Sequence, residues 1–193
     1  FPRLWLTLVA LAACVRALVG QPMISEFMAS NRANLADVDG AYSDWIELHN
    51  PDAVEVDLTG WYLTDTSANR TRWQFPAVSI PAGGYLVIFA SNKDRTDPGA
   101  ELHTNFALSA GGEYLGLIRP DGTTVAFEYA PQFPAQTDDV SYGILALAGG
   151  EPDTRTFFQT PTPGKANVIP TAAAPTEKVI FSRASGPFTK EFS

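Results

Sequence analysis

The sequence predicts an all-β domain of the sandwich or barrel type. Short runs rich in Val, Ile, Phe, Tyr and Trp recur between clusters of Gly, Pro, Asn and Asp, a spacing that is typical of such folds. No comparable 3.6-residue periodicity runs through residues 22–168, and only residues 29–35 would fit a helical turn. The length of 193 residues fits one globular domain with additional segments.

Nine segments have the strand pattern. Pro120, Asp121 and Gly122 separate two of them and predict a hairpin turn. The run 85–90 is apolar at every position, which predicts a central strand that is covered on both faces. We expect strands at residues 23–28, 44–50, 54–58, 61–65, 72–75, 85–91, 113–119, 123–129 and 139–143.

Alternation in residues 44–49 predicts a strand with one core face and one semi-exposed face. Ile46 and Leu48 fall on the first face, because side chains two positions apart lie on the same side of a strand. The second face carries a large aromatic ring beside two polar side chains, and either the protein's own fold or a partner must cover it. The second possibility makes Trp45, Glu47 and His49 the candidate binding residues.

Two other tryptophans, Trp61 and Trp73, could stack on a sugar or anchor a partner if they lay on a sandwich face, but we expect them to pack in the core.

Carboxylates near residue 40 suggest a weak calcium site. Asp37, Asp39 and Asp44 could supply oxygen ligands, but the calcium-loop pattern fails because Ala41 occupies its fifth position. A plain Asp-Gly turn explains the segment equally well. No other cofactor is expected.

No catalytic constellation is apparent in the sequence. The two histidines, His49 and His103, have no cysteine partners that would make a zinc site. No serine lies in a nucleophile-elbow motif. We therefore expect no catalytic residues and no enzymatic activity.

The first 20 residues resemble an export signal, with a basic residue followed by an apolar run. Three outcomes remain open: ordinary cleavage, lipidation at Cys14, or an uncleaved anchor, which Arg16 would interrupt. Each outcome predicts a secreted or cell-surface protein, with membrane contact only through the signal or a lipid on Cys14.

The charge balance argues against nucleic acid as a partner. The chain has 21 acidic and 13 basic residues and a net charge of −8. Loss of Arg3 and Arg16 with the signal would leave 11 basic residues and a net charge of −10. That sign repels phosphate backbones.

The C-terminal part has a different composition. Residues 160–175 contain four prolines and an alanine-rich stretch, which is typical of a linker. Apolar residues return at 179–182, where a further domain is expected to begin.

Residues 24–31, 39–50, 58–65, 73–76, 80–85 and 161–167 follow one another in a consistent order. Together these segments resemble the lamin tail domain family in its exported bacterial form. The resemblance implies an immunoglobulin-like β-sandwich without a shared catalytic residue set, used for binding, anchoring or assembly beside other modules. Residues 179–188 resemble the opening of a chitobiase C-terminal-like sandwich.

The combined expectation is a non-catalytic binding, anchoring or spacer module of a larger exported bacterial protein. Its expected partners are attached domains of the same chain and a protein or a neutral polysaccharide at the cell surface. Two alternatives are an accessory domain of an extracellular enzyme and a self-assembling structural module. The expected organisation is a signal peptide at 1–20, the sandwich at 21–168, a linker at 169–178 and the start of another domain at 179–193.

Overall fold

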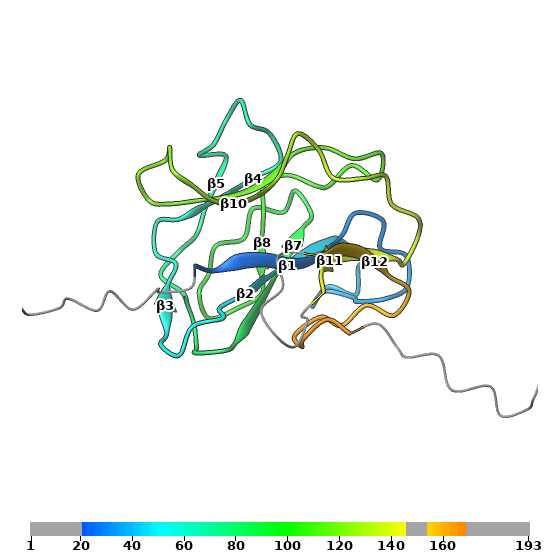
Figure 1. Cartoon of the computed structure of the whole chain (residues 1–193), viewed down its shortest axis with the longest axis horizontal. Coiled ribbons are helices and arrows are strands. Elements are labelled where there is room, and N and C mark those ends of the chain that lie inside the picture. Colours follow the sequence, from blue (N-terminus) through cyan, green and yellow to red (C-terminus); the bar gives the residue numbers. More distant parts are fainter. Residues whose placement is uncertain (1–20, 146–153, 169–193) are drawn as a thin grey trace, which may run out of the picture.

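The computed structural model describes residues 21–145 and 154–168 (Figure 1). Within these residues no helix is long and apolar enough to cross a membrane. The strands of the described part are β1 (Met23–Met28), β2 (Asp44–His49), β3 (Val56–Asp57), β4 (Tyr62–Thr64), β5 (Trp73–Gln74), β6 (Ser79–Ile80), β7 (Tyr85–Ala90), β8 (Leu102–His103), β9 (Leu115–Ile118), β10 (Val125–Tyr129), β11 (Ser141–Ile144) and β12 (Arg155–Phe158).

Two main sheets pack face to face, so the predicted all-β sandwich is confirmed. The larger sheet has the order β12-β11-β1-β2-β7-β8, and the smaller has the order β10-β9-β4-β5. In Figure 1 the smaller sheet lies above the larger one. A short β3-β6 pair stands apart from both sheets, and only β7 and β8 pair in parallel.

Each of the nine predicted segments overlaps a strand, whereas β6, β8 and β12 were not predicted. β6 and β8 are two residues long, too short for a visible alternation, and β12 follows a segment rich in turn residues. Strand β7 lies between β2 and β8, but its first three residues are only half-buried. The prediction that this strand is covered along its whole length is therefore wrong.

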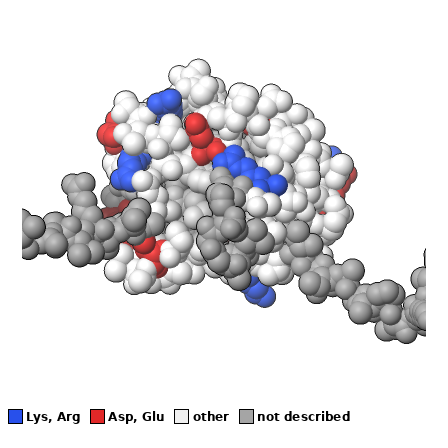
Figure 2. All heavy atoms as spheres, viewed as in Figure 1, with Lys and Arg blue, Asp and Glu red and all other residues white. Residues whose placement is uncertain are grey.

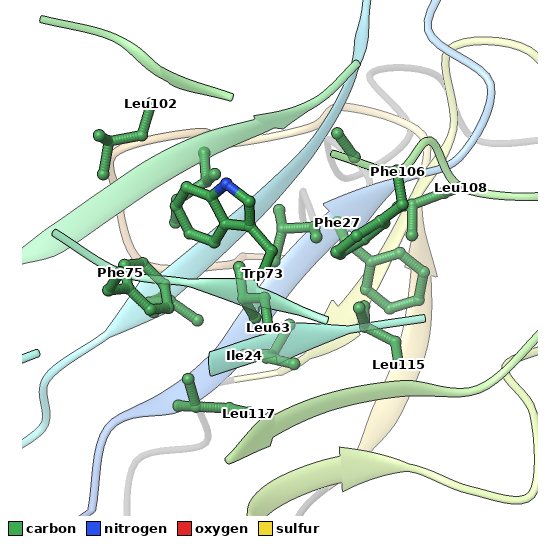
Figure 3. Close-up of a cluster of buried hydrophobic side chains, with 14 of the residues drawn as sticks. Ile24, Phe27, Leu63, Trp73, Phe75, Leu102, Phe106, Leu108, Leu115 and Leu117 are labelled. Atoms are coloured by element: carbon green, nitrogen blue, oxygen red, sulfur yellow. The ribbon is translucent and has the colours of Figure 1, made fainter. Parts of the chain in front are cut away.

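The main core fills the space between the two sheets (Figure 3). Phe27 of β1 makes edge-on contacts with Tyr129, at 4.9 Å between ring centroids, and with Phe133, at 4.7 Å, a geometry that aromatic rings favour. Trp61 and Trp73 are 8% and 2% exposed, which confirms their predicted place in the core.

Strand β11 approaches β1 so closely that only glycine fits at residue 143. A Cβ atom there would lie 2.2 Å from the Ser25 carbonyl oxygen and 2.8 Å from the Glu26 Cα. We expect Gly143→Ala to lower the free energy of unfolding by about 3 kcal/mol or more, because the main chains must move apart. Chemical denaturation measures this loss.

Gly111→Ala is the matched control for this substitution. The nearest atom to a Cβ at residue 111 is the Ser109 Oγ, at an ordinary 3.7 Å. Equal stability of the two variants would contradict the close approach of β11 to β1.

Candidate functional site

The face of the larger sheet that points away from the smaller sheet carries a second buried layer, here called the outer face. Met28, Trp45 and Phe89 form a separate apolar cluster on it, with Leu35 packed against them. Trp45 is 0% exposed. The loop that contains Leu35 covers this part of the sheet, held by the Asn31 side chain, whose Nδ2 donates to the Leu35 carbonyl oxygen at 2.6 Å.

The predicted face of Trp45, Glu47 and His49 exists, but its predicted exposure is wrong. Alternation places all three on the outer face, opposite Ile46 and Leu48. Trp45 and Glu47 are completely buried, and His49 is half-buried with its ring stacked on Tyr85 at 4.4 Å. The binding prediction depended on an exposed Trp45 ring, and that ring is buried.

Two glutamates lie side by side on the outer face. Glu26 of β1 and Glu47 of β2 are cross-strand partners, and both are 0% exposed. The Ser25 Oγ donates to the Glu47 Oε1 at 2.5 Å, and the Ser141 hydroxyl of β11 donates to Glu26. Within the described residues neither carboxylate forms an ion pair with a basic side chain.

Residues 159–168, here called the strap, follow β12 and lie across this glutamate pair. The Thr162 main-chain N–H lies 3.2 Å from both carboxylate oxygens of Glu26, and the Gly164 N–H donates to the Glu47 Oε2 at 2.6 Å. The Asn167 Nδ2 donates to the carbonyl oxygens of Ser25 and Ile144, each at 2.9 Å. In Figure 1 the strap, in orange, runs below the larger sheet.

The composition suggested a linker from residue 160 onward, whereas residues 160–168 dock on the sheet. Composition alone suggested a linker because Pro and Gly are frequent in both linkers and tight turns. Here Gly164 adopts a φ of 82°, which glycine tolerates without steric cost. The turn aims main-chain N–H groups at the sheet, where the two carboxylates accept their hydrogen bonds.

Burial controls the titration of both glutamates. It raises the pKa of Glu47 to about 7 and also raises the pKa of Glu26. Hydrogen bonds from Ser25 and Gly164 oppose this effect at Glu47, whereas the neighbouring Glu26 carboxylate adds to it. Two adjacent buried carboxylates repel each other when both are charged, so protonation of one of them is favoured.

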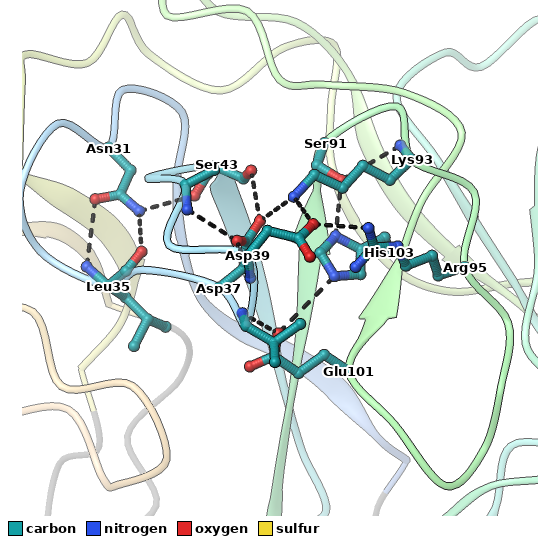
Figure 4. A network of polar contacts seen from close by, with 12 residues as sticks. Asn31, Leu35, Asp37, Asp39, Ser43, Ser91, Lys93, Arg95, Glu101 and His103 are labelled. Atoms are coloured by element: carbon teal, nitrogen blue, oxygen red, sulfur yellow. Dashed lines mark hydrogen bonds and ion pairs between the residues drawn. The ribbon is translucent and has the colours of Figure 1, made fainter.

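Asp37 and Asp39 take part in an ion-pair network with Lys93 and Arg95 (Figure 4). The Lys93 Nζ lies 2.5 Å from the Asp37 Oδ2 and 2.7 Å from the Asp39 Oδ2. Hydrogen bonds from Arg95 and Lys93 lower the pKa of Asp39 to about 2. Two cationic side chains therefore neutralise the carboxylates that were candidates for calcium.

The third calcium candidate, Asp44, belongs to different surroundings. Its Oδ1 accepts from the Asn31 main-chain N–H at 3.4 Å, and burial raises its pKa to about 6. Across residues 21–145 and 154–168 no three His, Cys, Asp or Glu side chains form a group that could hold a metal. The three aspartates do not form one site.

A Ser-His-Glu arrangement that the sequence did not reveal lies in the same network. The His103 Nδ1 is 2.8 Å from the Ser91 Oγ, and its Nε2 is 4.0 Å from a Glu101 carboxylate oxygen. The imidazole is completely buried and stacks on Phe89 at 5.3 Å. Because no substrate can reach the ring, we interpret the arrangement as structural.

A hollow of about 410 Å³ lies beside β5, an edge strand of the smaller sheet. Its lining includes Arg72, which pairs with Asp65, and Asn105. The Asn105 Nδ2 donates to the Arg72 carbonyl oxygen at 2.8 Å and so occupies one hydrogen-bonding position of this edge.

The family model described as Lamin Tail Domain matches residues 17–131. The chain belongs to the lamin tail domain family. A comparison with curated proteins gave no match. This lamin tail domain has the immunoglobulin-like sandwich fold of its family, which consists of structural, non-catalytic modules. Glu26 and Glu47 lie within the matched residues, whereas β11, β12 and the strap lie beyond them.

Proposed function

We propose that this lamin tail domain is a non-catalytic spacer that fixes the direction of attached segments within a larger exported bacterial protein. The observation that carries the proposal is the docking of the strap on the buried glutamate pair. A segment held by main-chain and side-chain hydrogen bonds leaves the domain in one direction, whereas a flexible linker would not.

The positions of the two described ends support a spacer. In Figure 1 the trace enters β1 on one side of the sandwich and leaves through the strap below the larger sheet. Segments that continue from these ends would be kept apart by the body of the domain. Membership of a family of non-catalytic modules supports a non-catalytic role for this domain.

Export and partner class are further parts of the proposal. Their support is the signal-like composition of residues 1–20, which lie outside the described residues together with Cys14. On the face in Figure 2, basic and acidic side chains lie among a larger uncharged area. A mixed surface on an acidic chain favours a protein or a neutral polysaccharide over nucleic acid as a partner.

Spin-label distance measurements test the spacer. Labels at Gln21→Cys and Val168→Cys in a Cys14→Ser background report the separation of the two described ends. At pH 5.5 we expect one narrow distance distribution, because the strap is docked. The double variant Thr162→Ala/Asn167→Ala should broaden the distribution, since it removes the strap's side-chain contacts with Glu26, Ser25 and Ile144.

Lys165→Ala is the matched control, because the Lys165 side chain is in the strap but exposed. It should leave the distribution narrow. A broad distribution in the protein without strap substitutions would refute the spacer.

A further inference from the structure

We propose that the strap is a proton-dependent latch, in which protonation of the Glu26–Glu47 pair holds residues 159–168 on the sheet and loss of the proton releases them. The latch rests on the same docked strap as the proposed spacer. It adds that the pH decides whether the strap is docked or released.

The placement of the pair supports the proton, because Glu26 and Glu47 are cross-strand partners that are both 0% exposed. The Thr162 hydroxyl lies 2.8 Å from the Asn167 Oδ1 and 3.1 Å from the Glu26 Oε2. The Asn167 amide orientation is fixed, because its Nδ2 donates to two carbonyl oxygens. A hydroxyl has one hydrogen. The Thr162 hydroxyl can therefore donate to Asn167 or to Glu26, and a protonated Glu26 can donate to the hydroxyl when the hydroxyl hydrogen points to Asn167.

The charged and titratable surroundings do not offer another source of neutralisation. Burial raises the pKa of Tyr85 in β7, and the nearby Glu47 carboxylate raises it further. His49 is half-buried on the same face, and burial lowers its pKa. The only basic side chain of the strap, Lys165, is exposed, and β11 contributes the Ser141 hydroxyl. The pair is therefore stabilised by a proton and not by a nearby cation.

The direction of the pH dependence follows from the raised pKa values. A buried glutamate with a raised pKa stabilises the docked strap fully below the ordinary value of 4.5. The stabilisation is lost as the pH rises through about 7. Docking should therefore be strong in mild acid and weak above neutrality.

Hydrogen-deuterium exchange of the full chain measures this change. Protection factors for the strap at pH 5 and pH 8 are corrected for the intrinsic pH dependence of exchange and compared with those of the β7 peptide. We expect strap protection to fall on the order of fiftyfold between pH 5 and pH 8, because a glutamate with a pKa of about 7 loses its proton over this range. Protection of the β7 peptide should change much less.

Three variants separate a latch from a general loss of structure. The double variant Glu26→Gln/Glu47→Gln removes both titrating groups but keeps an acceptor oxygen at each position, so the strap should stay protected at both pH values. Glu47→Gln alone should show a smaller fall than the unsubstituted chain, because burial still raises the pKa of the remaining Glu26. Glu128→Gln, in β10 of the other sheet, should behave like the unsubstituted chain.

Two kinds of result would overturn the latch. One is equal strap protection at pH 5 and pH 8 in the unsubstituted chain, or an equal fall in all three variants. The other is loss of protection at pH 5 in both glutamine variants at the pair, which would mean that charge holds the strap. The spacer is tested separately at pH 5.5, so a narrow distance distribution there together with a flat pH response would remove the latch alone.

Discussion

A fragment of residues 21–131, which ends where the family match ends, is expected to lack a cooperative unfolding transition. It loses β11 and β12 and therefore leaves β1 unpaired on one side. It also loses Phe133 and Phe158, which are nearly fully buried. Removing one such ring usually costs about 3–5 kcal/mol, and a whole domain is stable by only about 5–15 kcal/mol.

The fragment of residues 21–168 should unfold cooperatively as a monomeric all-β domain, because it retains the larger sheet and the strap. Circular dichroism with chemical denaturation distinguishes the two fragments. If residues 21–131 unfold cooperatively with a stability within about 1 kcal/mol of the longer fragment, then β11, β12 and the strap are not integral to the fold.

Trp45→Ala is expected to lower the free energy of unfolding by about 3–5 kcal/mol, the usual cost of deleting a large ring from a core. The ring is 0% exposed and packs with Met28, Phe89 and Leu35. Its Nε1 has no hydrogen-bond partner among residues 21–145 and 154–168, so the loss should come from apolar packing alone. Urea denaturation measures the change.

His49→Ala is the control on the same face of β2. The His49 ring is half-buried, and its main ring contact is the stack on Tyr85, so the expected loss is about 1 kcal/mol or less. If Trp45→Ala were as mild as His49→Ala, the tryptophan would be a surface residue and the original binding prediction would regain its basis.

The sequence determined the fold class and most of the strands. Strand-forming side chains and turn residues act over a few positions, so patterns such as the alternation around Ile46 or the turn at Gly122 can be recognised locally. The same local rule separated Trp45, Glu47 and His49 from Ile46 and Leu48 correctly. Alternation assigns a side chain to a face of the sheet.

Alternation does not say what covers that face. Trp45 is buried because the loop that contains Leu35, ten residues earlier in the chain, packs over it. Glu47 is buried because Gly164, far along the chain, donates a hydrogen bond to it. Contacts at such separations depend on the path of the whole chain, and no pattern within one strand carries that information.

The calcium candidates show the same limit. Asp37 and Asp39 lie close together in sequence and in space, but Lys93 and Arg95 reach them from more than 50 residues away. The sequence by itself determined the all-β fold class and the faces of the side chains in β2. Only the tertiary structure decided that two adjacent glutamates lie under a strap, because burial and pairing of charges arise where distant segments meet.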